Sequence, residues 1–484
     1  MEDSPAQQSQ VNADDDSHRE LADHSKLSDS KFSEASTNTL TELHIGIDDT
    51  DSEKGGCTTY TATVLFQNLI ERGFKASDFP WLVRLNPNIP WKTRGNGALA
   101  VHFFVDEEQI ENVQRLAIET VERTTVASAC GTDPALTFLK GEVSRTLREY
   151  STRALHDVLS VREARAVAAK AGAKIHALMG IRGIIGSLAA IGASLDSVEH
   201  TFEIIAYRIK ENLGTPRKID HESVKLMNAK HGNGTFNNLD PESGRVLVSP
   251  HGPDPVLLGI RGYGPQDVLS AFNEVHLGEE VERVMIFRTN QGTDAHLGKM
   301  RRAVDLKPHQ SGVLTGRVDD LPRVLRGGHV IFRLRDDSGL VDCAVYRPSG
   351  SLSVVARDLL PGDRVRVCGG VRGWREGRPT LNVEKLEVLH LVEKIKVANP
   401  MCSDCGGRCE SMGRGQGLRC KKCGQRNEDA TRIQVRQDRN LESTIYFPPP
   451  RARRHLTMPD SKPRNISNEY LRVEDFQLRV EDFN

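Results

Sequence analysis

The sequence lacks any apolar run of the ~18 residues that a membrane-spanning helix needs. Its N-terminus is acidic and has no apolar segment typical of a secretory signal, so we expect a cytoplasmic location. Aromatic residues make up only 5% of the 484 residues, which indicates that polar tails dilute the folded cores. Because the net charge is only −1, the chain as a whole is not positively charged. Any surface that binds nucleic acid must therefore come from a local concentration of basic residues.

A disulfide framework is not expected either, because the nine cysteines are odd in number and four of them form two CxxC pairs. The paired residues are Cys402, Cys405, Cys420 and Cys423. Each pair is followed by a glycine, Gly406 or Gly424, which permits a tight turn around a metal. Four thiolates in this spacing predict a closed, tetrahedral, structural Zn²⁺ site. Cys409 lies outside the pattern and is not expected to bind the metal.

One stretch near the N-terminus concentrates three carboxylates at the end of a short strand. Leu43, Ile45 and Ile47 alternate with small or polar residues and predict a strand over 43–48. The carboxylates are Asp48, Asp49 and Asp51. Because they repel one another, an ordered cluster calls for a cation, and hard oxygen ligands suit Mg²⁺ bound together with a phosphate.

The residues after this acidic stretch favour a nucleotide site over a simple acidic turn. Gly55 and Gly56 let backbone N–H groups approach an anion. An apolar-periodic helix is predicted over 58–72, and the N-terminus of a helix is a ready phosphate site.

A cationic loop before the strand 98–105 is a second candidate for phosphate contact. The nucleotide-binding residues expected there are Lys92, Arg94, Gly95, Asn96 and Gly97. The two cations can clamp phosphates and the glycines allow close approach. A solvated hairpin turn remains the alternative, since Asn-Gly is a common turn pair. The glycine-rich segment 180–192 fits close helix packing as well as phosphate binding.

Composition and periodicity divide the chain into six parts. They are an acidic disordered tail (1–42), a mixed α/β unit (43–200), a compact α+β unit (201–310), a β-rich unit (311–392), the zinc ribbon (393–430) and a basic, proline-marked tail (431–484). Within the compact α+β unit, 287–294 is predicted to be a surface loop. We have no physical account of the Leu-Arg-Val-Glu-Asp-Phe repeat within 471–483.

The β-rich unit has the element order of an OB-fold. Five β-rich runs occur, with a helical piece between the third and fourth. Its arginines cluster near the first two strands, at Arg317, Arg323, Arg326, Arg333 and Arg335. OB barrels bind nucleic acid over such a surface, so we expect an RNA contact here. The stiff cationic arm 448–455 is a further candidate for RNA contact.

Taken together, these motifs resemble the archaeal isoleucine-tRNA 2-agmatinylcytidine synthetases. The resemblance rests on the order Gly-Ile-Asp-Asp-Thr-Asp, Cys-Thr-Thr-Tyr, Pro-Trp-Lys-Thr-Arg-Gly-Asn-Gly, Gly-Thr-Phe-Asn-Asn, OB-fold, zinc ribbon and Pro-Pro-Pro-Arg-Ala-Arg-Arg-His. It covers about 43–457 and leaves both tails outside.

The resemblance implies a multidomain α+β protein with a kinase-like α/β catalytic domain, a ferredoxin-like domain, a five-stranded OB barrel and a zinc ribbon. It implies an ATP-dependent ligase that joins agmatine to C2 of the wobble cytidine of an isoleucine tRNA, so that the anticodon reads AUA instead of AUG. ATP is split to AMP in that family, and the threonine that becomes phosphorylated corresponds here to Thr58. The alternative is that Thr58 only caps a helix.

The two positive ends of agmatine need acceptors, and a carboxylate such as Asp240 or Asp254 could hold the guanidinium. The substrate-binding residues expected are Phe236, Asn237, Asn238, Asp240, Asp254, Arg451, Arg453 and Arg454. Two other functions remain open from the residues alone. One is a non-enzymatic OB-fold and zinc-ribbon protein that binds nucleic acid, which leaves the acidic loop unexplained. The other is an ATP-dependent RNA-modifying ligase that uses a different amine.

Overall fold

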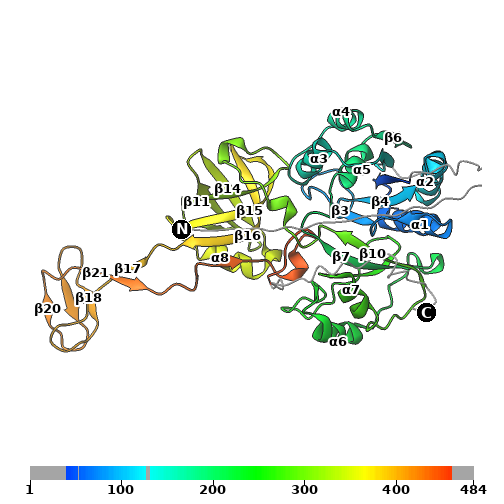
Figure 1. Ribbon diagram of the computed structural model, residues 1–484. Coiled ribbons are helices and arrows are strands. Elements are labelled where there is room, and N and C mark those ends of the chain that lie inside the picture. The colour runs from blue at the N-terminus through cyan, green and yellow to red at the C-terminus, as the bar shows by residue number, and fades with distance from the viewer. Residues whose placement is uncertain (1–39, 53, 127–130, 376, 461–484) are drawn as a thin grey trace, which may run out of the picture. The chain divides into compact units, whose positions relative to one another are not determined.

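The computed structural model describes residues 40–460, except 53, 127–130 and 376 (Figure 1). The predicted acidic tail lies outside the described residues up to position 39, and Thr41 and Glu42 already belong to the first strand. The Leu-Arg-Val-Glu-Asp-Phe repeat also lies outside them. In the described ranges, no helix is both long and apolar enough to cross a membrane.

A single ten-stranded sheet runs through both units that were predicted between 43 and 310. Across the sheet the strands are β6 (Lys174–Ala177), β5 (Ala135–Lys140), β1 (Thr41–Asp48), β4 (Gly97–Val105), β3 (Trp81–Arg84), β10 (Val281–Thr289), β7 (Thr201–Arg208), β9 (Val256–Gly262) and β8 (Thr235–Phe236), with β2 (Lys75–Ala76) beside β4. The two halves meet where β3 pairs with β10, in parallel, through Trp81 with Arg288 and Leu82 with Thr289. The other strand pairs of this sheet are antiparallel.

Helices cover both faces of this sheet. They are α1 (Thr58–Glu71), α2 (Ile110–Thr124), α3 (Arg145–His156), α4 (Val161–Ala171), α5 (Gly183–Ile191), α6 (His221–His231) and α7 (Pro265–Phe272). The alternation in β1 sends Leu43, Ile45 and Ile47 into the core beneath α1 and α2. Between them, Gly46 lies against α5, where an added Cβ would come within 2.0 Å of the Ser187 carbonyl oxygen. The alternation therefore allows β1 to be packed on both faces.

The segment 287–294 is not a surface loop, so that prediction is wrong. Phe287 and Thr289 belong to β10 and are fully buried. Asn290 donates to the Arg84 carbonyl oxygen at 2.9 Å and accepts from the Arg84 N–H at 2.8 Å. Thr289 Oγ1 donates to the Leu82 carbonyl oxygen at 2.6 Å. These polar residues are buried because their side chains extend the hydrogen bonding between β3 and β10 beyond the end of the strand.

The OB-fold prediction is confirmed. The barrel strands are β11 (Ser311–Val318), β13 (Val330–Arg335), β14 (Leu340–Val345), β15 (Arg364–Arg375) and β16 (Arg378–His390), with α8 (Ser351–Arg357) between β14 and β15. Pairing of β11 with β13 closes the barrel. Of the clustered arginines, Arg333 pairs with Asp320 at 3.2 Å and Arg335 with Asp319 at 2.7 Å. Arg317, Arg323 and Arg326 are exposed and have no ion pair among the described residues.

The zinc ribbon is a three-stranded sheet of β18 (Cys409–Ser411), β19 (Leu418–Cys420) and β20 (Arg426–Asn427). A two-stranded ribbon leads into and out of it, because β17 (Lys394–Ala398) pairs with β21 (Ile433–Gln437). The start of the predicted C-terminal tail is therefore β-structure. After β21, β22 (Ile445–Tyr446) adds to the barrel strand β16.

Residues 447–460, which we call the C-terminal arm, contact four parts of the chain. Arg451 pairs with Asp240 at 2.5 Å and with Glu242 at 2.7 Å. Arg454 pairs with Glu384 of β16 at 2.8 Å and donates to the Pro87 carbonyl oxygen at 3.1 Å. The Gly292 N–H donates to the carbonyl oxygen of His455 at 2.9 Å. The arm therefore ties together the barrel, two loops of the second half of the sheet and the loop after β3.

We predict that Asp240→Asn lowers the free energy of unfolding in urea by about 2 kcal/mol, because a fully buried carboxylate loses its charge-assisted bond to Arg451. Glu242→Gln is the matched control. It removes the other carboxylate on Arg451, but 42% of that side chain is exposed, so a change below about 0.5 kcal/mol is expected. Equal effects of the two substitutions would contradict a structural role for the buried pair.

Candidate functional site

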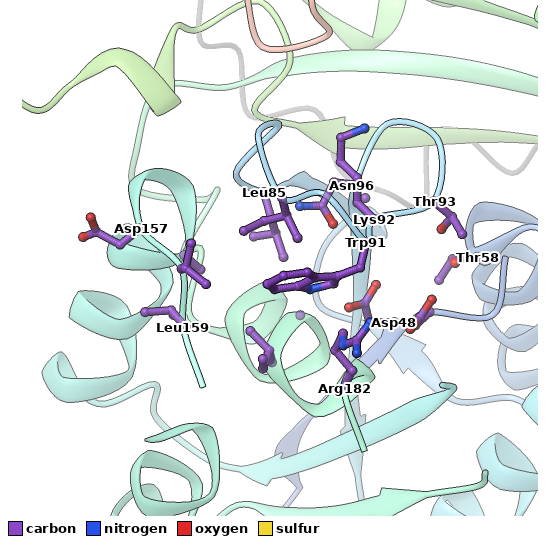
Figure 2. A pocket seen from close by; sticks show the side chains of 17 residues that line it. Asp48, Thr58, Leu85, Trp91, Lys92, Thr93, Asn96, Asp157, Leu159 and Arg182 are labelled. Atoms are coloured by element: carbon purple, nitrogen blue, oxygen red, sulfur yellow. The ribbon is translucent and has the colours of Figure 1, made fainter. Parts of the chain in front are cut away.

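A cleft of about 690 Å³ lies at the end of β1, beside α5 and the loop between β3 and β4 (Figure 2). Residues of five segments line it: Asp48, Asp49, Thr58, Leu85, Ile89, Trp91, Lys92, Thr93, Asn96, Gly97, Ala154, Asp157, Val158, Leu159, Arg182, Ile185 and Gly186. Two of the predicted acidic residues, the predicted threonine and most of the predicted cationic loop therefore line the same cleft. The sequence predicted these groups separately, and the fold brings them together.

Asp48 and Asp49 carry the negative charge of the cleft. Burial, followed by the neighbouring Asp49, raises the pKa of Asp48 well above its ordinary value. Burial also raises the pKa of Asp49, to about 6, and the charge of Asp133 adds to this effect. Arg182 lowers it only in part. Burial is therefore the main reason why the pKa values of both carboxyl groups are raised.

Asp51 has a different environment. Its Oδ1 accepts the Thr58 N–H at 2.6 Å and the Thr58 hydroxyl at 2.8 Å, so it caps the start of α1. The N-cap position itself belongs to Cys57, and Thr58 is the first residue of the helix. Thr58 is therefore not a simple N-cap. Its Oγ1 also accepts from the Thr50 hydroxyl at 3.1 Å, which fixes the hydroxyl orientation.

The three carboxylates are not brought together as one ligand set. Across the described residues, only four cysteines place metal-binding atoms close enough to be recognised as such a group. Asp48 and Asp49 face the cleft, whereas Asp51 is engaged by Thr58 and by Arg94. Gly55 and Gly56 have φ values of 133° and 79° and form the turn that brings the chain from Asp51 back to α1.

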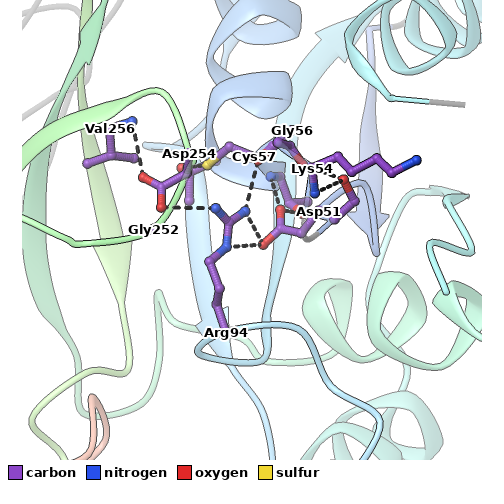
Figure 3. A network of polar contacts seen from close by, with 12 residues as sticks. Asp51, Lys54, Gly56, Cys57, Arg94, Gly252, Asp254 and Val256 are labelled. Atoms are coloured by element: carbon purple, nitrogen blue, oxygen red, sulfur yellow. Dashed lines mark hydrogen bonds and ion pairs between the residues drawn. The ribbon is translucent and has the colours of Figure 1, made fainter. Parts of the chain in front are cut away.

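The guanidinium of Arg94 lies between two carboxylates from the two halves of the sheet (Figure 3). Nη2 contacts Asp51 Oδ2 at 2.6 Å and Nη1 contacts Asp254 Oδ2 at 3.0 Å. Nη2 also donates to the Gly56 carbonyl oxygen at 2.9 Å. Burial alone would lower the pKa of Arg94, but Asp51 and the other acidic groups raise it above its ordinary value. Arg94 is therefore firmly charged and bound to protein groups.

The other residues of the 92–97 loop have structural partners as well. Lys92 Nζ donates to the Arg94 carbonyl oxygen at 2.8 Å, and Asn96 Nδ2 donates to the Asn86 carbonyl oxygen at 2.8 Å. A Cβ on Gly95 would come within 2.7 Å of Arg84 Nη1, and one on Gly97 within 2.9 Å of the same atom. Side chains at these glycines would therefore collide with Arg84, a steric requirement that is independent of any phosphate.

In the glycine-rich segment 180–192, the glycines allow close helix packing, which is one of the two roles that its sequence suggested. A Cβ on Gly183 would lie 2.3 Å from the Asp133 carbonyl oxygen, and one on Gly186 would lie 1.9 Å from Asp48 Oδ2. These glycines let α5 approach the sheet closely, directly behind the acidic pair.

Trp91 and Arg182 are among the cleft residues that sequence reasoning missed. The indole of Trp91 lies across the cleft between Leu85 and Arg182 in Figure 2, and 48% of it is exposed. The Arg182 guanidinium lies 5.3 Å from the centre of that ring. Their signal in the sequence is weak, because a tryptophan after Pro90 and an arginine between two glycines are common in loops.

The predicted substrate-binding residues fall into two groups. Asp254 reaches the guanidinium of Arg94, next to the cleft. Phe236 is buried against Tyr263 and Asn238 is buried beside Thr235, so both are packed inside the second half of the sheet. Asn237 accepts a hydrogen bond from Arg453 at 3.3 Å. Asp240, Arg451, Arg453 and Arg454 are engaged in the contacts of the C-terminal arm. Substrate contact by either group stays a prediction.

The four predicted cysteines form a metal site. Their sulfur atoms all lie within 4.8 Å of one another. Cys402 and Cys423 have sulfurs 3.7 Å apart, and those of Cys405 and Cys420 are 3.4 Å apart. Tetrahedral Zn²⁺ with ~2.3 Å bonds requires ~3.8 Å between sulfurs, so the set fits zinc. Hydrogen bonds from the backbone N–H groups of Cys423 and Lys422 lower the pKa of Cys420 to about 6, which favours the thiolate.

Family models match four consecutive parts of the chain. They are the TiaS TCKD domain (44–180), the TiaS FLD domain (181–296), an OB-fold nucleic acid binding domain (313–389) and the TiaS C-terminal zinc ribbon domain (399–441). TiaS of Pyrococcus horikoshii, a tRNA 2-agmatinylcytidine synthetase, is 41% identical over 423 residues, which cover 87% of this chain and 98% of the relative. The chain belongs to the TiaS family. The TiaS protein of Methanocaldococcus jannaschii is 38% identical over 86% of this chain and 98% of its own length.

Solved TiaS structures share the whole architecture. A complex of TiaS with an isoleucine tRNA and ATP matches with a TM-score of 0.78 and 37% identity, over 89% of this chain and 99% of that one. A complex of TiaS with an isoleucine tRNA, AMPCPP and agmatine matches with a TM-score of 0.75 and 35% identity, over 87% and 96%. The likeness therefore extends over all four matched parts of the TiaS fold.

We predict that the purified chain holds one Zn²⁺, and that Cys420→Ser removes it and unfolds the ribbon. Binding of tRNA should then be lost while ATP binding remains, since structural zinc provides much of the folding free energy of a small module. Elemental analysis and separate titrations with tRNA and ATP check this. Cys409→Ser is the matched control, because Cys409 pairs with Cys420 across β18 and β19 but is not one of the four ligands. Zinc loss from the Cys409 variant alone would refute the ligand assignment.

Proposed function

We propose that this protein is an ATP-dependent ligase that joins agmatine to C2 of the wobble cytidine of an isoleucine tRNA. The observation that carries the proposal is the convergence of Asp48, Asp49, Thr58 and the cationic loop on one cleft, in a chain of the TiaS family. The solved TiaS relatives contain an isoleucine tRNA with ATP, and with AMPCPP and agmatine, and so point to the same substrates. The modified base pairs with A instead of G, and a cytoplasmic location follows from this role in decoding.

The chemistry must overcome a poor leaving group. The C2 oxygen of cytosine is urea-like and does not leave as such. When this oxygen attacks a phosphoryl group of ATP, an O–P bond forms and the bond from phosphorus to the rest of the nucleotide breaks. The agmatine amine then adds to C2 and loses a proton, and inorganic phosphate leaves with the former C2 oxygen. A flipped, single-stranded anticodon base suits a cleft of this size.

The acidic pair fits a magnesium ion. Asp48 and Asp49 are oxygen donors that line the same cleft, and a divalent cation would offset the cost of holding both carboxylates charged where burial raises their pKa values. Bound Mg²⁺ neutralises charge on the ATP phosphates. The ligand set proposed here is narrower than the three aspartates expected from the sequence, since Asp51 binds Thr58 and Arg94 instead.

Thr58 is the proposed phosphoryl acceptor within the protein. Asp51 Oδ1, 2.8 Å from the hydroxyl, is positioned to take its proton as Thr58 Oγ1 forms a bond to a phosphorus of ATP and the bond from that phosphorus to the rest of the nucleotide breaks. The start of α1 and the positive end of its dipole then lie beside the transferred group. The phosphothreonine of this step is a proposal that the self-labelling experiment below tests.

Recognition of the tRNA would fall to the barrel and the ribbon. Arg317, Arg323 and Arg326 of the barrel are exposed without ion pairs in the described residues, and the ribbon adds exposed cations around its zinc site. Phosphate contacts of this kind hold a tRNA in register while the wobble base is presented to the cleft.

Incubation of the chain with ATP, agmatine and an isoleucine tRNA should convert the wobble cytidine to 2-agmatinylcytidine, as read by mass spectrometry of the nucleosides. Asp49→Ala should abolish ATP turnover and modification, because it removes one of the two carboxylates proposed for the metal. It should still bind tRNA with parental affinity in a filter-binding assay. An Asp49 variant that hydrolyses ATP at the parental rate would exclude this residue from the metal site.

A second experiment addresses Thr58. We predict that Thr58→Val abolishes self-labelling by γ-labelled ATP in the absence of RNA, whereas Thr58→Ser retains it. The valine side chain keeps the shape of threonine, so its cost in stability should be about 3 kcal/mol, for the lost hydrogen bonds to Asp51 and from Thr50. Thr59→Val is the matched control, since the Thr59 hydroxyl lies 3.0 Å from the Cys57 sulfur and does not contact Asp51. Loss of labelling in the Thr59 variant alone would move the acceptor to Thr59.

A further inference from the structure

One buried asparagine connects the walls of the cleft to the OB barrel. Asn86 is only 1% exposed. Its N–H donates to the Ala154 carbonyl oxygen at 3.0 Å, and its own carbonyl oxygen accepts from Asn96 Nδ2 at 2.8 Å. Its side-chain amide donates to the carbonyl oxygens of Asp157 at 3.1 Å and His309 at 2.8 Å. Ala154, Asn96 and Asp157 line the cleft (Figure 2), whereas His309 belongs to the segment that leads into the barrel strand β11.

Two positions later, the side chain of Asn88 lies on the barrel itself. Its Nδ2 donates to the Ser311 hydroxyl of β11 at 2.7 Å, and its Oδ1 accepts from Arg454 at 3.2 Å. Its backbone N–H donates to Asn86 Oδ1 at 3.0 Å. An added Cβ on Gly370 of β15 would come within 2.0 Å of Asn88 Oδ1. The barrel surface at Ser311 and Gly370 is therefore shaped around this one amide.

His309 makes a third connection between the barrel and the cleft loop. Its Nδ1 donates to the Asn88 carbonyl oxygen at 3.1 Å, and its backbone N–H donates to the Val371 carbonyl oxygen of β15 at 2.8 Å. Its ring centre lies 6.4 Å from that of Trp91. The φ of His309 is 65°, a left-handed conformation that is uncommon for residues other than glycine. Such conformations persist where the surrounding contacts determine them, so the barrel and the loop are fitted to each other here.

We propose that Asn88 is a positioning residue, through which the barrel holds the cleft loop in the position that the reaction requires. The inference rests on the proposed function and adds that the barrel sets the rate of the reaction as well as binding RNA. Trp91 and Lys92, which line the cleft, follow Asn88 by three and four positions. A displacement at Asn88 is therefore passed on to groups at the reacting centre, where a shift of about 1 Å can cost about 100-fold in rate.

Gly370→Ala tests the inference from the barrel side. The three atoms nearest to the new Cβ all belong to the Asn88 side chain, so this side chain moves and the barrel keeps its fold. At saturating ATP, agmatine and isoleucine tRNA, we expect the single-turnover rate of 2-agmatinylcytidine formation by the full-length protein to fall at least tenfold. The Kd for tRNA, measured by filter binding, should stay within twofold of the parent.

Gly373→Ala is the matched control. It adds the same methyl group to the same strand, but no atom lies within 4 Å of the new Cβ. We expect it to keep both the parental rate and the parental Kd for tRNA.

A double variant separates positioning from a general defect of the barrel. Asn88→Ala removes the amide that the new methyl group meets and should itself lower the rate. Gly370→Ala should then cause no further loss in the Asn88→Ala background, because both changes break the same contact.

Three outcomes would overturn the inference. They are equal rates for Gly370→Ala and Gly373→Ala, a loss in the double variant that is the product of the two single losses, and a Gly370→Ala protein that loses tRNA affinity but keeps the parental single-turnover rate. In each case a parent that forms 2-agmatinylcytidine leaves the proposed function intact. A parent that forms none refutes the proposed function itself, so the two failures are distinguishable.

Discussion

Two residue pairs of parallel β-structure join the two halves of the ten-stranded sheet. Where β3 meets β10, Trp81 pairs with Arg288 and Leu82 with Thr289, and the Asn290 side chain adds two hydrogen bonds to the backbone of Arg84. The chain leaves β3 here and enters the loop that carries Trp91 and Arg94. The position of this loop over the cleft therefore depends on a strand far later in the sequence. Since β10 pairs with β7 on its other edge, both halves of the sheet become one support for the site.

Aspartates only a few positions apart have unlike roles because their surroundings differ. Asp48 and Asp49 both line the cleft, Asp48 against Gly186 and Asp49 with Arg182 and Asp133 nearby. Asp51 is turned toward α1 by the Thr58 N–H and toward the second half of the sheet by Arg94. The first two can serve a cation, while the third organises a helix start, a hydroxyl and a guanidinium. Environment, and not residue type, assigns the chemistry of a carboxylate.

Local patterns predicted the regular elements well. The alternation of Leu43, Ile45 and Ile47 predicted β1, and the five β-rich runs with a helical piece between the third and fourth predicted the barrel. The spacing of four cysteines predicted the zinc site. α3 was missed although its signal is present: Ser144 accepts the Leu147 N–H as an N-cap, and Leu147, Tyr150 and Ala154 are buried at helical spacing. Burial of 287–294 could not be predicted, because polar side chains are buried there only by bonds to a distant strand. The ion pairs of Arg94 with Asp51 and Asp254 could not be predicted either, since these two aspartates come from separate halves of the sheet.

The C-terminal arm also has a consequence for how the protein is made. Ribosomes release a chain from its N-terminus onward, so residues 447–460 emerge after the sheet, the barrel and the ribbon. Until they do, Asp240 and Glu384 lack their arginines, and the segment 292–294 that follows β10 lacks its bonds to His455 and Leu456. The loop around Gly95, against which His455 packs, is likewise incomplete. A nascent chain that lacks this segment would thus carry the cleft residues without the contacts that tie their supports together.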